Sequence, residues 1–144
     1  MTDALSLVRV YNVRLSKIPE DERTQETKIE AMKQSLRIRS YLSFNQKQDL
    51  VKKVISQTIT KADGRIIYNS CEKYIAFVNA LLSSYTDLDV QPNTYDMLCS
   101  NDLLNLVVAA IGSEYELCLG VMEMYMSDLE AGRISLDQCY ECES

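Results

Sequence analysis

Two cysteines near the end of the chain, and pairs of carboxylates in its second half, are the residues whose spacing could support chemistry. Cys139 and Cys142 have the C-x-x-C spacing of a metal-binding or redox pair. A structural zinc site needs four ligands, and the chain has no histidine to help complete one. A redox pair would open a helix in a thioredoxin-like fold, and no such pattern surrounds these cysteines. We therefore interpret them as peripheral thiols and predict no metal and no cofactor.

The acidic pairs favour a surface role over catalysis. General acid–base catalysis needs two carboxylates in a cleft where their pKa values are pushed apart. These pairs lie where helices are expected to begin or end, so we expect them to be solvated. The absence of histidine also excludes Ser-His and Cys-His nucleophile pairs. We predict that the chain is not an enzyme. The pairs are Asp87/Asp89, Glu114/Glu116 and Asp128/Glu130, together with Glu141/Glu143 in the expected tail.

Charge is distributed unevenly along the chain. Residues 1–86 contain 14 basic and 9 acidic side chains, whereas residues 87–144 contain one basic and 12 acidic side chains. The two stretches therefore carry net charges of +5 and −11, within a total of −6. An asymmetry this large is the most unusual feature of the sequence, and the basic stretch is interpreted as a solvated face or as a face for an acidic protein surface. Nucleic acid is disfavoured, because the acidic stretch would repel a phosphate backbone and the basic stretch carries no recognition motif.

The composition predicts one globular domain in a reducing compartment. A chain of 144 residues buries about 68–70% of its unfolded surface, so its core needs no disulfide or metal. Five cysteines, an odd number, favour free thiols in the cytosol. The N-terminus lacks the features of a signal peptide, and no apolar run approaches the roughly 20 residues of a membrane span. We therefore expect no membrane partner.

The elements that must position these residues are organised around an apolar stretch from Ser100 to Gly132. It reads as two helices joined at Gly112, and the first is apolar almost all the way round. The second helix carries alternate methionines at 122, 124 and 126, which cannot all share one helix face. We expect at least one of them to be exposed or in an interface, as suits this adaptable side chain. Of the two interpretations of the run, a binding surface or a helix buried at the centre of the domain, we favour the buried helix.

Capping and turn signals predict further helices around this stretch. Thr24 can begin a helix that runs to about Ser40, and Ser43 with Gln46 forms a capping box for the next helix. Asp63-Gly64 predicts a turn. Two more helices are expected, one starting at Asn69 or Ser70 and one starting at Asn93.

The predicted fold class is all-α, a compact bundle of five or six helices around the central helical hairpin. Residues 4–15 are ambiguous, because their β-branched residues suit a strand or an extended arm while a frayed helix is the other choice. A short extended N-terminal segment is therefore part of the prediction. The expected organisation is an N-terminal arm over residues 1–23, a helical domain over 24–132 and a C-terminal tail over 133–144.

Two stretches resemble small phage-encoded proteins. The stretch Ser40-Tyr-Leu-Ser-Phe-Asn-Gln-Lys-Gln-Asp-Leu-Val-Lys-Lys-Val-Ile is similar to the "Tyr-Leu-x-Phe-x-x-Lys-x-x-Leu" helix start of uncharacterised α-helical accessory proteins from phages of gut and Gram-positive bacteria. Ser83-Ser-Tyr-Thr-Asp-Leu-Asp, followed by Tyr95-Asp-Met-Leu, resembles "Tyr-Thr-Asn-x-Asp…Tyr-Asp-x-Leu" in the same group. The resemblance covers about half of the chain and brings no catalytic residues. It implies an accessory protein that acts in virion assembly or on a host system.

We expect a non-enzymatic protein-interaction module of the host cytoplasm or the virion. In one version it is a virion or assembly protein, whose partners are other virion proteins or further copies of itself joined through the basic and acidic stretches. In the other version it is an anti-CRISPR type inhibitor that occupies the basic groove of a host defence nuclease with a DNA-mimicking acidic surface. The predicted partner-binding residues are Asp87, Asp89, Glu114, Glu116, Glu123, Asp128 and Glu130.

Overall fold

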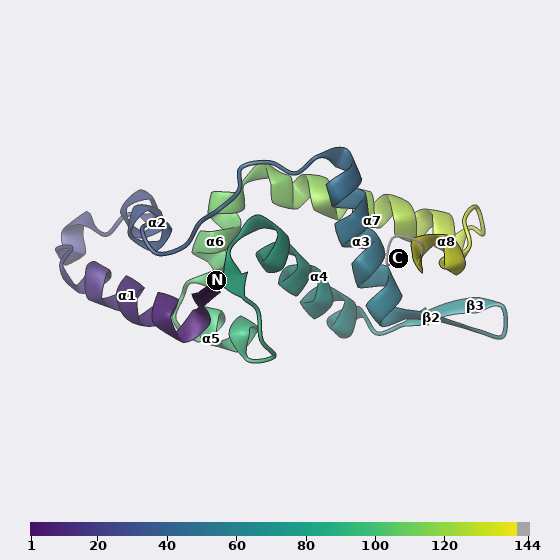
Figure 1. Ribbon diagram of the computed structural model, residues 1–144, viewed down its shortest axis with the longest axis horizontal. Helices are drawn as coiled ribbons and strands as arrows, with labels where there is room; N and C mark the ends of the chain where they lie inside the picture. Colours follow the sequence, from purple (N-terminus) through teal and green to yellow (C-terminus); the bar gives the residue numbers. More distant parts are fainter. Residues whose placement is uncertain (141–144) are drawn as a thin grey trace. The chain divides into compact units, whose positions relative to one another are not determined.

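The computed structural model describes residues 1–140 and is predominantly helical, which confirms the helical character predicted from the sequence (Figure 1). Within those residues there are eight α-helices, one short 3-10 helix and two small two-stranded sheets. The chain divides into two compact units, each built from two separate stretches. Unit 1 consists of Met1–Ser40 and Leu82–Gly112, and unit 2 consists of Tyr41–Leu81 and Ser113–Ser144.

Unit 1 is a cluster of short helices with one parallel pair of two-residue strands. Helix α1 contacts both α2 and α5, and α2 in turn contacts α6. Strand β1 pairs with β4 in parallel, so Thr2 lies opposite Leu88. The elements are β1 (Thr2–Asp3), α1 (Ala4–Ser16), the 3-10 helix (Glu20–Glu22), α2 (Gln25–Lys33), β4 (Leu88–Asp89), α5 (Thr94–Ser100) and α6 (Leu104–Ile111).

The N-terminal residues form a helix, and the extended piece is limited to Thr2–Asp3. The Asp3 carboxylate caps α1 by accepting a hydrogen bond from the Ser6 amide at 3.3 Å. Ala4, Leu7, Val8 and Tyr11 are buried at the i, i+3, i+4, i+7 spacing of one helix face. Tertiary packing of that face therefore outweighs the β-branched character that left residues 4–15 open between strand, arm and helix.

Helix α2 is shorter than the sequence predicts. Thr24 caps it as expected, accepting a hydrogen bond from the Thr27 amide, but the helix ends at Lys33. The following residues bond elsewhere in unit 1, because the Arg39 amide donates to the Tyr85 carbonyl at 2.7 Å and Ile38 bridges Thr86. These long-range backbone bonds replace the helical bonds that a continuation toward Ser40 would have made.

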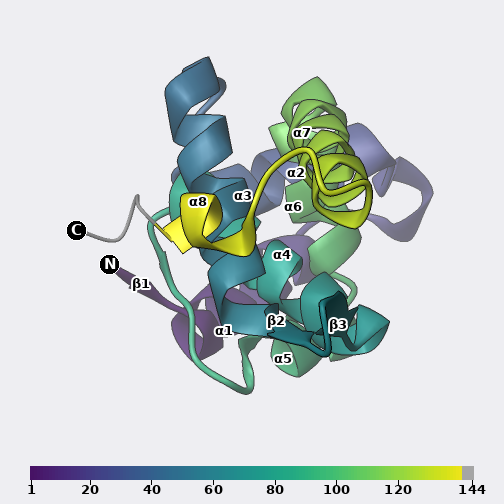
Figure 2. The ribbon, with the colours of Figure 1, turned by 90° about the vertical axis from the view of Figure 1, so that its right-hand side faces the viewer.

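Unit 2 is built on helix α3, which contacts both α7 and α8. Figure 2 shows α8 beside α3. The predicted capping box of Ser43 and Gln46 is present at the start of α3. The Asp63-Gly64 turn joins an antiparallel hairpin, in which Ile59 pairs with Tyr68. The elements are α3 (Phe44–Thr58), β2 (Ile59–Ala62), β3 (Arg65–Tyr68), α4 (Ser70–Tyr85, whose last four residues belong to unit 1), α7 (Ser113–Glu130) and α8 (Leu136–Tyr140).

The predicted tail contains one further helix. Residues 136–140 form α8, where Leu136 and Cys139 are buried. Cys142, the second cysteine of the C-x-x-C pair, lies outside the described residues. The domain limits predicted at residues 23 and 132 stay a prediction.

In residues 1–140, no single helix has both the length and the apolar character needed to cross a membrane; helices α6 and α7 meet that test of length and composition only when counted together as a bent pair.

Candidate protein-interaction surface

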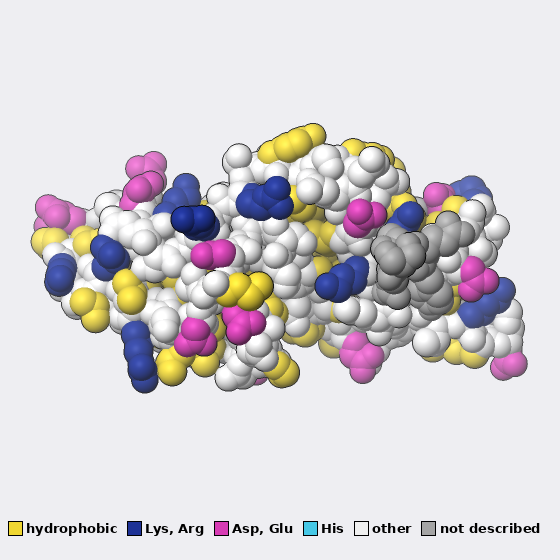
Figure 3. Space-filling view, viewed as in Figure 1, with side chains coloured by type: hydrophobic (Ala, Val, Ile, Leu, Met, Phe, Trp, Pro, Cys, Tyr) yellow, Lys and Arg dark blue, Asp and Glu magenta, His cyan; other side chains and the backbone are white. Residues whose placement is uncertain are grey.

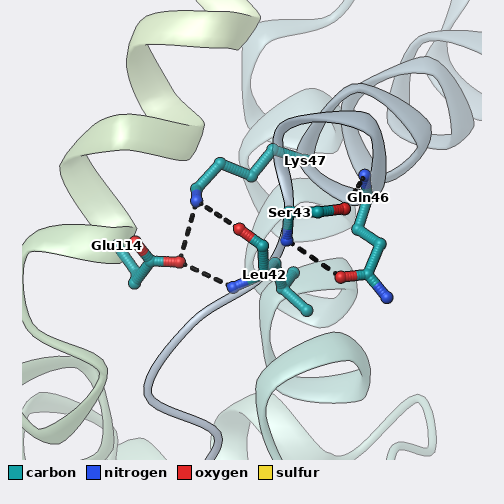
Figure 4. Close-up of polar contacts among 5 residues, drawn as sticks. All are labelled: Leu42, Ser43, Gln46, Lys47 and Glu114. Atoms are coloured by element: carbon teal, nitrogen blue, oxygen red, sulfur yellow. Dashed lines mark hydrogen bonds and ion pairs between the residues drawn. The ribbon is translucent and has the colours of Figure 1, made fainter.

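A buried ion pair fixes the start of α7 against the start of α3. The ammonium of Lys47 lies 2.9 Å from Glu114 Oε1 and also donates to the Leu42 carbonyl at 2.6 Å. The Leu42 amide donates to the same Glu114 oxygen at 2.9 Å, so one carboxylate oxygen receives both groups (Figure 4). The side chains of Lys47 and Glu114 are only 6% and 8% exposed. The contacts therefore lock the segment that enters α3 onto α7, and Glu114 differs from the solvated carboxylate expected at a helix start.

Asp87 and Asp89, the other early members of the predicted acidic surface, belong to unit 1. The Asp87 carboxylate accepts hydrogen bonds from Thr2 Oγ1 at 2.9 Å and from the Arg37 amide at 3.0 Å. Asp89 is half-buried and accepts from Gln91 Nε2 at 3.0 Å. Asp87 therefore joins two parts of unit 1, which is a structural role.

Three of the predicted residues share one face of α7. Glu116, Glu123 and Glu130 are exposed and follow one another at intervals of seven residues, so they form a stripe along the helix. Successive carboxylates of this stripe are about 10.5 Å apart along the axis. Asp128 lies off the stripe and pairs with Arg133 at 2.8 Å on the surface. The structure thus brings together three of the seven predicted residues, which we call the α7 acidic stripe.

An apolar groove runs beside the acidic stripe. It has a volume of about 570 Å³ and is formed by α7 and the start of α3. Tyr41, Phe44, Leu117 and Met124 line it with 64%, 57%, 53% and 56% of their surface exposed. Hydrophobic side chains gather on the surface of unit 2 at the top of the view in Figure 3. We call this feature, lined by Tyr41, Phe44, Leu117, Gly120, Val121 and Met124, the α7 groove.

Gly120 makes the α7 groove accessible at its middle. A Cβ added there would meet no heavy atom within 4 Å, so the space above the helix backbone is open. The wall opposite is held in place, because the Lys47 ammonium lies 4.6 Å from the centroid of the Tyr41 ring in a cation–π contact. The buried ion pair therefore also orients a wall of the groove. A rigid apolar groove of this kind can bind an apolar side chain or a helix face of another protein.

A second groove of about 660 Å³ lies between α7 and the first turns of α4. Tyr74, Phe77, Tyr115, Met122 and Met126 are among its lining residues. At one end the Tyr68 hydroxyl donates a hydrogen bond to Glu130 Oε1 at 3.2 Å. Burial raises the pKa of Tyr68, and this hydrogen bond raises it further by a smaller effect. Glu123 and Glu130 line this second groove, so the acidic stripe runs between two apolar grooves of unit 2.

The methionine pattern predicted part of this surface, and the rest escaped sequence analysis. Met122 and Met126 are buried whereas Met124 is exposed, which confirms that the three cannot share one face. Tyr41 and Phe44 were missed, because a helix start with a good capping box gives no sign that its aromatic residues are exposed. The available signal was a glycine in the middle of a predicted helix, since glycine weakens a helix and marks positions of close backbone approach.

The charge asymmetry along the sequence does not become a charge difference between the units. Within residues 1–140, unit 1 contains eight basic and ten acidic side chains, and unit 2 contains seven and nine. Each unit combines one stretch from the basic part of the sequence with one from the acidic part, so both are mildly acidic. Charge of one sign is concentrated on single helices. Helix α7, for example, carries acidic but no basic side chains.

Comparison of the chain with protein-family models, with curated proteins and with solved structures finds no match. Its function is therefore inferred from the geometry of the surface.

Proposed function

We propose that the chain is a non-enzymatic protein-interaction module that docks a segment of a partner protein in the α7 groove. The observation that carries this proposal is the contiguous set of exposed apolar side chains, Tyr41, Phe44, Leu117 and Met124, around the open position of Gly120. Contiguous apolar surface is costly to expose to water and marks interaction sites in globular proteins. The acidic stripe beside the groove adds selectivity for a partner with basic residues flanking its apolar anchor.

The biological setting that we propose is virion assembly by a phage, in the host cytoplasm or in the particle. The resemblance of residues 40–55, 83–89 and 95–98 to phage accessory proteins supports this setting. In this setting the partners are other virion proteins or further copies of the chain.

We also propose, for the fold, that the helices form one bundle organised around the Ser100–Gly132 stretch.

The test is incorporation of variants into purified particles from a phage genome that encodes the chain. Leu117→Glu places a charge in the α7 groove, and Ile67→Glu places the same charge at another exposed apolar position, 51% exposed on β3. We expect mass spectrometry to detect the unmodified chain and the Ile67→Glu variant in particles and to find the Leu117→Glu variant depleted. Equal incorporation of both variants would refute docking in the groove, and absence of the unmodified chain would refute the assembly role.

A second candidate is an inhibitor of a host defence nuclease, which would use the exposed carboxylates of the α7 acidic stripe to imitate phosphate groups. Its three carboxylates extend over about 21 Å of helix, whereas duplex DNA places one phosphate charge about every 1.7 Å of axis. The stripe is therefore far sparser than DNA. If this candidate is correct, reversing Glu116 and Glu123 to Lys abolishes binding to a purified nuclease effector and DNA competes with the unmodified chain. Binding that is unchanged by DNA and by the reversal would exclude it.

A further inference from the structure

The exposed face of α1 has the composition that the α7 groove and its acidic edge would select. Leu5, Val10 and Val13 are 42%, 38% and 56% exposed, although the opposite face of the same helix is buried in unit 1. Arg9 is exposed among them, and Lys17, the C-cap residue that follows α1, is exposed at the end of the helix. The outer face of α1 therefore presents apolar side chains interleaved with basic ones, which we call the α1 ridge.

The α1 ridge and the α7 groove are complementary in charge. Arg9 and Lys17 are eight residues apart, about 12 Å along a helix, and Glu116 and Glu123 are seven residues apart, about 10.5 Å. Two basic groups can therefore face two carboxylates along the same length of helix. Asp3 caps α1 and its side chain is engaged with Ser6, so the exposed charges after the first turn of α1 are basic.

The two surfaces are also complementary in shape and polarity. Leu117 and Met124 are two turns apart with Gly120 between them, so the middle of the groove lacks a side chain. Leu5 and Val13 are eight residues apart on the ridge and can contact the two ends of the groove. A residue without a side chain at the crossing point lets two helices approach closely.

We propose that the occupant of the α7 groove is the α1 ridge of a second copy of the chain. This inference rests on the proposed function, because it names the partner segment that the groove takes. The ridge and the groove are different surfaces, so the contact is heterologous, and each copy keeps one free ridge or groove after pairing. Successive copies therefore add head to tail until a ring closes or a filament extends. Exposed ion pairs at the edge make this assembly sensitive to salt.

The experiment is the solution mass of the full chain by light scattering over a range of concentrations at low and high salt. We expect a mass larger than one chain that rises with concentration at low salt and falls at high salt. Val13→Glu disables the ridge and Gly120→Gln fills the groove, and each variant alone is expected to weaken association by at least about tenfold. Both substitutions introduce good helix formers at exposed or open positions, and circular dichroism verifies that each variant is folded.

An equimolar mixture of the two variants gives the decisive result. The Gly120→Gln chain keeps its ridge and the Val13→Glu chain keeps its groove, so the mixture forms a one-to-one dimer and nothing larger. Ile67→Glu, the matched control outside both surfaces, assembles like the unmodified chain. A folded chain that stays monomeric at all concentrations and at both salts overturns the inference, as does a mixture that does not pair. The proposed function fails separately, through particle incorporation that does not respond to Leu117→Glu.

Discussion

At the scale of single residues, the contacts of Glu114 show how a carboxylate that resembles a surface group can serve as a structural one. The sequence places it in the first turn of a helix, where acidic residues are favoured by the helix dipole. The chain then brings the Leu42 amide and the Lys47 ammonium onto the same carboxylate oxygen. Burying two charges costs free energy, and the extra hydrogen bonds at both ends offset much of that cost.

Removing the Glu114 carboxylate is expected to be strongly destabilising. Glu114→Ala leaves a buried ammonium and a buried amide without this acceptor, a class of change that costs about 3–5 kcal/mol. Glu114→Gln keeps a neutral acceptor oxygen for the Leu42 amide and is expected to cost less. Urea unfolding measures both changes. The control is Asp128→Ala, which removes the exposed pair with Arg133 and is expected to cost about 0–1 kcal/mol. Equal losses for Glu114→Ala and Asp128→Ala would contradict the role of the buried pair.

Tyr11 makes the stability of the chain sensitive to high pH. Burial, and next the negative charge of Asp102, raise its pKa above the usual value of about 10, while Arg23 lowers the pKa by a smaller effect. Because the folded chain holds this proton more tightly than the unfolded chain, the free energy of unfolding is expected to fall as the pH rises above about 10. Tyr11→Phe removes the titrating group and is expected to flatten this part of the pH profile.

Urea unfolding between neutral pH and pH values above the usual tyrosine range tests the expectation for Tyr11. Tyr41→Phe is the control, because Tyr41 is 64% exposed whereas Tyr11 is 2% exposed. The control variant measures how the loss of a tyrosine hydroxyl at an exposed position affects the same profile. A profile that is unchanged by Tyr11→Phe would show that other groups cause the loss of stability at high pH.

At the scale of elements, local signals predicted where helices begin, and tertiary contacts decided where they end. Thr24 and Ser43 form the expected caps, and Asn69 Oδ1 accepts from the amides of Cys71 and Glu72 at the start of α4. The predicted end of α2, near Ser40, was wrong. The backbone after Lys33 forms hydrogen bonds with residues some fifty positions away, and no local sequence pattern encodes such pairing. Strand β2 was missed for a similar reason, since its pairing is defined only once the Asp63-Gly64 turn has formed.

The candidate surface was predictable only in part, because it combines separate elements. The period of seven in Glu116, Glu123 and Glu130 was present in the sequence, and it makes a stripe once α7 is a single helix. The opposite wall of the groove comes from Tyr41 and Phe44, about 75 residues earlier. The two walls are held together by the ion pair of Lys47 with Glu114, and the spacing of these two residues in the sequence does not predict that contact.

Replacing Gly120 is expected to stabilise α7, because the glycine lies inside a helix without the backbone conformation or crowding that would require it. Gly120→Ala meets no atom within 4 Å and is expected to raise the free energy of unfolding by about 0.5–1 kcal/mol. Gly64→Ala is the matched control, since Gly64 has a φ of +76° in the β2–β3 turn and the change is expected to destabilise. Thermal unfolding distinguishes the two signs. A loss of stability in Gly120→Ala would mean that the position is constrained in the folded chain.

At the scale of the whole molecule, the path of the chain links the two units. The chain passes from one unit to the other after Ser40, after Leu81 and after Gly112, so neither unit is a continuous segment. Helix α4 contributes residues Ser70–Leu81 to unit 2 and residues 82–85 to unit 1. Its backbone hydrogen bonds, which run from each amide to the carbonyl four residues earlier, therefore cross the boundary in the sequence. We expect this shared helix to make the two units unfold together.

Ser83→Pro tests whether α4 couples the units. Ser83 is exposed, so the substitution removes no core side chain, but proline deletes a helical hydrogen bond and clashes with the preceding turn at a cost of about 3 kcal/mol. Hydrogen exchange followed by mass spectrometry at increasing denaturant reports the opening free energy of each segment. We expect segments of units 1 and 2 to share one opening free energy in the unmodified chain and in the control Ser83→Ala.

In Ser83→Pro the opening free energies of the two units are expected to differ, because the break in the helix lies just after the point where α4 enters unit 1. If the two units already open separately in the unmodified chain, α4 does not couple them and the three crossings only connect independently folding parts.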